Sequence, residues 1–195
     1  MALSVKRFVV ETLRDGRIRS INFRYGSILV YPEGFSRDVA KLVQDGHIQF
    51  TNTPGAHYTV DARPGERHTM ALPSQDVEPD PRTGALNVRG SPGSLFRGTI
   101  VHEATHALQD YQRHPSDPRT AEGAAYLAGW MANLLWGYPP LPAAVRPTTG
   151  HAYARRLAER RLQSQIGYVI PEAEVRALND LVLTGSASRY VFNGI

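Results

Sequence analysis

Hydrophobic and polar residues alternate over short stretches in roughly the first ninety residues of the chain. Four stretches are rich in β-branched or aromatic side chains and are bounded by Gly, Pro, Asn or Asp, a pattern that predicts strands. They span residues 8–13, 28–31, 47–52 and 57–62. A further strand pair is expected at residues 68–72 and 85–88, and the acidic, proline-containing residues 73–84 between them predict a loop.

One helix is expected among these strands. Residues 36–44 carry apolar side chains at helical spacing, with Ser36 as the cap and Gly46 as the residue that stops the helix. This part of the chain therefore predicts a small sheet with an inserted helix.

From about residue 91 onward the apolar residues recur with the period of an amphipathic helix. Asp117 and Pro118 are a cap followed by a proline at the first helical position, and Pro171 opens a last helix. The proline-rich connection 139–150 is long enough to be mobile. The predicted helices span residues 95–112, 120–136, 152–166 and 172–183.

The two patterns together predict an α+β fold with a small N-terminal mixed sheet and then a helical half. The strand-rich part covers residues 1–90 and the helical part residues 91–195. A chain of 195 residues fits one domain with one core, so we expect a single domain over residues 1–195.

Composition limits the chemistry that this chain can perform. It contains no cysteine, which excludes disulfides, thiolate metal sites and cysteine nucleophiles. Any metal ion must therefore be held by histidine and carboxylate side chains.

The formal net charge of +4 comes almost entirely from arginine. The one arginine cluster alternates with apolar residues at helical spacing, and no base-stacking aromatic side chains accompany it. We interpret it as a solvated helix face and expect no nucleic-acid partner. Its members are Arg155, Arg156, Arg160 and Arg161.

The amino terminus has the charges of Lys6 and Arg7 after a very short apolar run, so it lacks the order of a secretory signal. No apolar stretch approaches the roughly 20 residues that are needed to span a bilayer. We therefore expect a soluble protein, without a membrane span, that is cytoplasmic at synthesis.

The sequence His102-Glu103-Ala104-Thr105-His106 lies within the first predicted helix of the second part. Residues four apart on a helix project about 40° from each other, so both imidazoles can reach one ion. The helix phase places both histidines on the side opposite the main apolar stripe. Glu103 points to the edge of that side, where its carboxylate can contact a zinc-activated water without binding the ion. The pattern therefore predicts a zinc site with Glu103 as general base.

A catalytic zinc needs a third protein ligand and an open position. Metzincins have a histidine six residues after the second ligand, but Gln112 occupies that position, which excludes this class. Glu122 is the preferred candidate, because it lies in the first turn of the next helix and small neighbours allow the two helices to approach closely. His114, in a loop, and Asp117 stay open as alternatives, although capping accounts for Asp117.

His102-Glu103-x-x-His106 followed by Glu122 on a second helix resembles the gluzincin branch of the zincin metallopeptidases, over roughly residues 85–136. The resemblance implies a zincin-like fold, Zn²⁺ as the cofactor, His102, His106 and Glu122 as its ligands, and Glu103 as the base. It implies a peptide or protein substrate, aligned by an edge strand at residues 68–72 or 85–88 that lines the cleft.

The chain lacks the longer second-helix motif of large secreted gluzincins. It is more similar to minimal zincins, of the kind found in bacterial metallopeptidase toxin or effector domains. That similarity implies export by a specialised secretion system.

A hydrogen-bond donor for the negative charge that develops on the attacked carbonyl is also expected. His151 is the first choice, and Tyr153 and Tyr126 are alternatives. Asp110, one turn after His106, is a candidate acceptor that orients a metal-site histidine. The histidines in predicted strands, which we interpret as structural, are His47, His57 and His68.

The leading hypothesis is a zinc-dependent metallopeptidase that hydrolyses amide bonds. A second is a catalytically inactive binding module that keeps a zincin fold. A related alternative is an effector or toxin domain that acts on a non-protein amide such as peptidoglycan. A third is a nucleic-acid-binding protein that uses the helix with Arg155 to Arg161, although only its charge favours it. The sequence makes no prediction of oligomeric state.

Overall fold

The computed structural model describes residues 3–59, 68–113 and 116–182. These residues form a mixed α+β fold. The elements in chain order are α1 (Val5–Arg14), η1 (Gly16–Ser20), β1 (Phe23–Tyr25), β2 (Ile28–Val30), η2 (Gly34–Val39), α2 (Ala40–Asp45), β3 (Ile48–Thr53), β4 (His57–Thr59), β5 (His68–Pro73), β6 (Val77–Pro79), β7 (Leu86–Val88), α3 (Ser94–Tyr111), α4 (Pro118–Leu135), α5 (Gly150–Leu162) and α6 (Glu172–Leu181).

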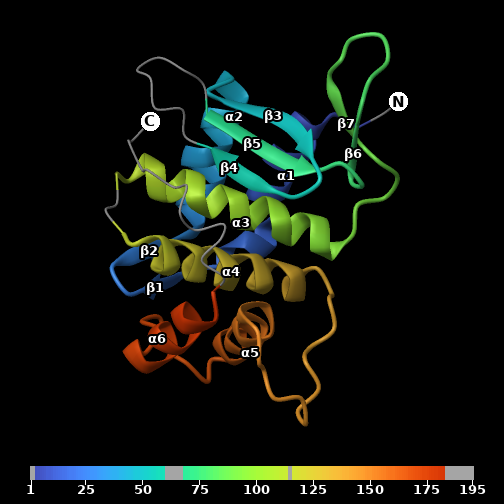
Figure 1. Cartoon of the computed structure of the whole chain (residues 1–195). Helices are drawn as coiled ribbons and strands as arrows, with labels where there is room; N and C mark the ends of the chain where they lie inside the picture. Colours follow the sequence, from blue (N-terminus) through green and yellow to red (C-terminus); the bar gives the residue numbers. More distant parts are fainter. Residues whose placement is uncertain (1–2, 60–67, 114–115, 183–195) are drawn as a thin grey trace.

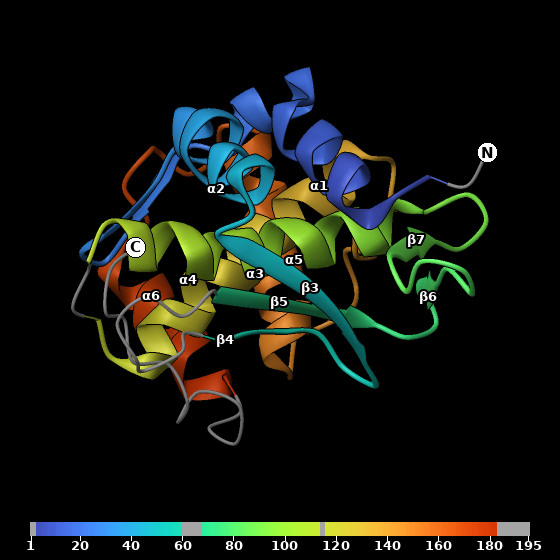
Figure 2. The same cartoon turned by 90° about the horizontal axis from the view of Figure 1, so that it is seen from above.

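The elements are stacked in layers. In Figure 1 the strands β3, β5 and β4 lie above α3, α4 lies below α3, and α5 and α6 lie below α4. In Figure 2, which is seen from above, α1 and α2 lie on the upper side of the picture and the same three strands lie below them. The α+β prediction is confirmed, with the small sheet early in the chain and long helices later.

The largest sheet has the strand order β3-β5-β4. β5 is central: β3 pairs with it in parallel, from Ile48 opposite His68, and β4 pairs with it antiparallel, with Tyr58 opposite Met70. β4 is therefore an edge strand, and it lies beside α3. Of the predicted strand 57–62, residues 60–62 lie outside the described residues.

The predicted pairing of residues 68–72 with 85–88 is wrong. β7 pairs instead with β6, from Val77 opposite Val88, so a strand lies within the predicted loop 73–84. Neither β5, which is central, nor β7, which is in a separate hairpin, is the edge strand beside α3. Residues 68–72 and 85–88 are therefore both wrong as predictions of the edge strand that lines the cleft. Strand pairing depends on contacts that are distant in sequence, which the sequence pattern does not contain.

The predicted strand at residues 8–13 is also wrong, because this segment belongs to helix α1. Ser4 caps the helix, its hydroxyl oxygen accepting from the Arg7 backbone N–H at 3.3 Å. Val5, Phe8 and Val9 lie on one buried face at helical spacing. A short apolar run fits both a buried strand and the buried side of a helix, and tertiary packing decides between them.

The helix predicted at residues 36–44 is present but begins earlier, as the π-helical turn η2 followed by α2. Ser36 is not its cap, because it lies inside η2 and its hydroxyl donates to the Pro32 carbonyl at 3.0 Å. Gly46 ends α2 as predicted, with a φ of 81° in the left-handed region that glycine adopts without strain.

All four predicted helices of the second half are present as α3 to α6. Asp117 caps α4, its carboxylate accepting from the backbone N–H groups of Arg119 and Thr120, both at 3.0 Å. Helix α5 ends at Leu162, four residues before its predicted end. The last residue predicted for α6, residue 183, lies outside the described residues.

The proline-rich connection 139–150 is held against α5 rather than left without contacts. The Arg156 guanidinium donates to the Pro142 carbonyl at 2.8 Å, and Arg155 donates to the Pro139 carbonyl. The Glu159 carboxylate accepts from the Leu141 backbone N–H. Three side chains of one helix therefore fix the course of this connection.

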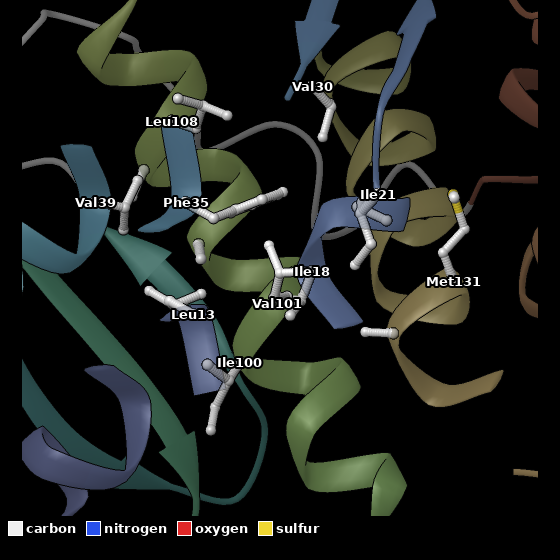
Figure 3. Close-up of a cluster of buried hydrophobic side chains, with 14 of the residues drawn as sticks. Leu13, Ile18, Ile21, Val30, Phe35, Val39, Ile100, Val101, Leu108 and Met131 are labelled. Carbon is white, nitrogen blue, oxygen red and sulfur yellow. The ribbon is translucent and has the colours of Figure 1, made fainter. Parts of the chain in front are cut away.

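The first ninety residues and the helical half share one hydrophobic core. Figure 3 shows Leu13, Phe35 and Val39 from the early helices beside Ile100 and Leu108 of α3. All five side chains are buried. Helix α3 is thus packed from the N-terminal side as well as by α4, which fixes its position in the molecule. Among the described residues, no helix is both long and apolar enough to cross a membrane.

Candidate metal centre

Helix α3 presents His102, Glu103 and His106 within the protein interior. His106 is fully buried and Glu103 is 2% exposed. The side of α3 that carries the histidines packs against α4, and α3 is buried on most of its circumference. Each of the three side chains offers a ligand atom within 4.8 Å of the others.

Helix α4 brings Glu122 to both histidines. Its Oε2 lies 3.4 Å from His102 Nε2, and its Oε1 lies 3.6 Å from His106 Nε2. The two Nε2 atoms are 3.3 Å apart. Each oxygen of the Glu122 carboxylate therefore faces one of the two imidazole nitrogens, and these three side chains are called the triangle below.

The dimensions of this triangle fit a tetrahedral zinc ion. Ligand atoms about 2.05 Å from such an ion lie about 3.3–3.4 Å from one another. The two Nε2 atoms are 3.3 Å apart, and the Glu122 oxygen that faces each of them lies at 3.4 Å (Oε2 to His102) or 3.6 Å (Oε1 to His106), so each separation is close to that value. Two imidazoles and one carboxylate are also a donor set that occurs in catalytic zinc sites, where a fourth position is left open.

Glu103 lies beside the triangle rather than within it, its Oε1 being 4.0 Å from His102 Nε2. Its Oε2 is buried, and no hydrogen-bond partner for it is found among the described residues. A buried carboxylate oxygen without a donor is costly, so it requires a water molecule or a substrate group. The position suits a base that acts on a water beside the ion.

The environment separates the two carboxylates in their affinity for protons. Burial raises the pKa of Glu103, although His102 and His106 act in the opposite direction. Burial would also raise the pKa of Glu122, but hydrogen bonds with His102 and His106 outweigh it and hold that pKa well below its usual range. Glu122 is thus held as an anion while Glu103 accepts a proton more readily, the division of roles that an acid–base site requires.

Gln109 supports the site from behind. Its Oε1 lies 3.3 Å from Nδ1 of His106, and its Nε2 donates to the Ala121 carbonyl at 3.2 Å. One amide therefore orients the His106 ring and ties α3 to the start of the helix that carries Glu122. The sequence analysis does not predict Gln109 as a partner of His106. Its place three residues after His106 on the same helix is a signal that indicates such a contact.

Asp110, the expected histidine acceptor, is fully buried. Its Oδ2 lies 3.3 Å from Nδ1 of His68 and 3.5 Å from the Tyr58 hydroxyl oxygen. The rings of Tyr58 and His68 are stacked, with centroids 5.9 Å apart. Asp110 therefore joins α3 to β4 and β5, the strands beside it.

A cleft of about 1000 Å³ opens onto the cluster. One wall is the segment from Thr53 to Thr59, which includes the edge strand β4. The opposite wall comes from α4 and α5, and its members are Tyr126, Gly129, Trp130, Asn133 and His151. His102, Glu103 and Glu122 line the cleft between these walls.

The structure separates the three oxyanion candidates. His151 and Tyr126 both line the cleft, with ring centroids 4.5 Å apart, and the Tyr126 centroid is 5.1 Å from that of His102. Burial, followed by the carboxylates of Glu122 and Glu103, raises the pKa of Tyr126 to about 12, so it keeps its proton. Tyr153 is not a cleft residue, because its hydroxyl donates to Glu174.

His57, which the sequence predicts in a strand, lies in β4 and lines the cleft. In β4 Tyr58 is buried while His57 and Thr59 are exposed and line the cleft. The alternation of a strand explains this placement, but only once β4 is known to be the edge strand. His114, the alternative ligand, lies outside the described residues, and Asp117 is the cap of α4.

The arginine cluster of α5 is not a solvated face. Arg155 and Arg156 have side chains that are 14% and 27% exposed and lie 3.8 and 3.0 Å from Glu159. Arg160 pairs with Glu174 at 2.7 Å, and Arg161 donates to the Asn22 carbonyl. Arg160 and Arg161 therefore tie α5 to α6 and to the segment before β1, while Arg155 and Arg156 bond within α5 and to the connection before it.

The chain was compared with protein-family models, curated proteins and solved structures. None of the three comparisons returned a match. The functional assignment therefore depends on the site itself.

Proposed function

We propose that this protein is a zinc-dependent metallopeptidase with a gluzincin-like site. The observation that carries the proposal is the triangle of His102, His106 and Glu122, whose separations fit one tetrahedral ion. When bound, zinc would acidify a water molecule and polarise the carbonyl of the scissile amide.

The chain's own residues divide the remaining work. His102, His106 and Glu122 would hold the ion, and Glu122 contributes the negative charge of the ligand set. The Glu103 carboxylate takes a proton from the attacking water and delivers it to the leaving amine. Its buried Oε2, for which no partner is found in the described part of the chain, supports this role.

The cleft walls would bind and orient the substrate. β4 is an edge strand beside the cluster, so its backbone is placed to pair with an extended peptide. On the opposite wall His151 and Tyr126 are the side chains placed to donate a hydrogen bond to the developing oxyanion. An extended peptide between these walls passes over His102 and Glu103.

The test combines metal analysis with a matched pair of glutamate substitutions. Wild type, Glu103→Gln and Glu172→Gln would be stripped with a chelator, reloaded with Zn²⁺ and assayed on casein, a mixed peptide library and peptidoglycan. Glu172 is the control because its side chain is 78% exposed on α6, away from the cleft. We expect one zinc per chain in all three proteins.

Hydrolysis should fall by about 10²–10⁴-fold in Glu103→Gln alone, the usual contribution of a general base. Full activity in Glu103→Gln, or no stoichiometric zinc in the wild type, would contradict the proposal. Cleavage of peptidoglycan without cleavage of peptides would keep the mechanism and assign the non-protein substrate. Zinc binding without any hydrolysis would favour a binding module.

A further inference from the structure

Helices α3 and α4 cross at a pair of glycines, Gly98 and Gly129. A Cβ atom on Gly129 would lie 2.9 Å from the Gly98 carbonyl oxygen and 3.2 Å from Cβ of His102. A Cβ atom on Gly98 would lie 2.7 Å from the Gly129 carbonyl oxygen and would collide with the side-chain oxygen of Asn133. The two backbones are therefore closer than any other residue at these positions would allow.

Backbone conformation does not require either glycine. Neither adopts a positive φ, unlike Gly46 or Gly137. Within a helix, glycine is less favourable than alanine by about 1 kcal/mol. The close approach of the two helices is the feature that accounts for both residues.

The crossing lies next to the proposed metal site. His102 follows Gly98 by one turn, and Gly129 follows Glu122 by about two turns. On another side of α4, a Cβ on Gly123 would collide with the Tyr25 hydroxyl and lie 2.8 Å from Oδ1 of Asn179. α4 is thus packed closely on this side as well. A side chain added where α3 and α4 cross would therefore change the distance between these two helices.

We propose that Gly98 and Gly129 are positioning residues that set the helix separation at which Glu122 reaches both histidines. This inference rests on the proposed function only in taking His102, His106 and Glu122 as the ligands of one ion. Zinc–ligand distances vary by only about 0.2 Å in good sites. A methyl group that moves the helices apart by a few tenths of an ångström at this crossing therefore weakens the site.

The test measures zinc affinity rather than activity. Gly129→Ala is the principal variant, because its closest contacts, at 2.9 and 3.2 Å, are less severe than those at Gly98. Gly93→Ala is the matched control: Gly93 precedes the first turn of the same α3, and a Cβ there would have no neighbour within 4 Å. Affinities would be measured by competition with a chromophoric chelator, and folding by circular dichroism.

We expect the Zn²⁺ dissociation constant of Gly129→Ala to rise about 10- to 100-fold, the range seen when groups that support metal ligands are altered. Gly93→Ala should bind as wild type does. The visible spectrum of the Co²⁺-loaded protein should change in Gly129→Ala alone, because it reports ligand geometry, which a general loss of stability does not alter.

A second variant tests the same crossing from α3. Gly98→Ala combined with Asn133→Ala removes the side-chain collision and leaves the contact with the Gly129 carbonyl. It should fold and bind Zn²⁺ weakly. Wild-type affinity in either folded variant would overturn the inference, as would failure of both to fold, since the glycines would then serve the fold as a whole.

The two proposals fail in different ways. Wild-type protein that binds Zn²⁺ but hydrolyses nothing would refute the peptidase, while the comparison of affinities would still decide the role of the glycines. Hydrolysis that depends on Glu103, together with unchanged affinity in the glycine variants, would refute the positioning role alone. A wild-type chain that binds no Zn²⁺ would refute both.

Discussion

Substitution of Asp117, the N-cap of α4, tests two predictions: the stability that the cap provides, and the choice between Asp117 and Glu122 as the third zinc ligand. The Asp117 carboxylate accepts from the backbone N–H groups of Arg119 and Thr120 at 3.0 Å, and from the Thr120 hydroxyl. Asp117→Ala removes all three hydrogen bonds. Loss of an N-cap costs about 0.5–2 kcal/mol, and three bonds place this one at about 1–2 kcal/mol.

For a chain of this size each kcal/mol shifts the melting temperature by about 2–4 °C, so we expect a decrease of about 2–8 °C for Asp117→Ala. Asp117→Asn keeps a capping oxygen and should differ little from wild type. Thermal melts followed by circular dichroism at neutral pH measure the melting temperatures of both variants. Equal melting temperatures for the alanine variant and wild type would refute the capping argument.

The same cap makes a prediction about pH. Partial burial opposes ionisation of Asp117, but the hydrogen bonds from Thr120 and Arg119 outweigh it and lower its pKa. A carboxylate whose pKa is lower in the folded state stabilises the fold at pH values above its unfolded-state pKa of about 3.9. This stabilisation is lost as the pH falls through the folded-state pKa. The difference in stability between wild type and Asp117→Ala should therefore be constant near neutral pH and should decrease below about pH 4.

Zinc binding by the same proteins decides the ligand. Asp117→Ala should retain one zinc per chain, because the carboxylate faces its own helix start rather than the histidines. Glu122→Gln, which removes the anionic ligand, should lose stoichiometric zinc while it keeps its helical content. The reverse outcome would assign Asp117 as the ligand and refute the triangle.

Two further substitutions test the groups around the site. Gln109→Leu should raise the Zn²⁺ dissociation constant about 10- to 100-fold, because it removes the acceptor for the Nδ1–H of His106. Gln163→Leu, at the exposed end of α5, is the control and should leave the constant unchanged. Equal Zn²⁺ affinities of the two variants would contradict the role of Gln109. His151→Ala should lower kcat by about 10²–10³-fold without changing zinc affinity, as loss of an oxyanion donor does, and an unchanged kcat would leave Tyr126 as the donor.

The helical half could be predicted from sequence because its signals are local. Asp117 and Pro118 mark one helix start, and long periodic stretches distinguish helix from strand. His102, Glu103 and His106 share one helix, so their proximity follows from helix geometry alone. Glu122 could be selected because it opens the next helix among small residues, although the contact itself depends on how α3 and α4 pack.

The early part of the chain was harder to predict, because its elements are short and depend on distant partners. Residues 8–13 fit both the strand and the helix period, and burial against α2 and α3 decided for helix. The edge position of β4 follows from its pairing with β5 across the intervening residues. The place of His57 on the cleft wall could not be inferred without that pairing, and the same holds for the Asp110 contacts with Tyr58 and His68.

Residues that lower the stability of the fold are concentrated at one place, and this concentration is itself an argument for function. Glu103 and Glu122 are carboxylates in a protein interior, where an unpaired charge is costly. Gly98 and Gly129 weaken two helices that alanine would strengthen. Each feature alone reduces stability, and natural chains keep such departures mainly where a site requires them. All four residues lie where α3 meets α4, and all four line the cleft together with His102. A fold selected for stability alone would place apolar side chains and alanines there, so the crossing of α3 and α4 is where substitution should separate zinc binding from folding.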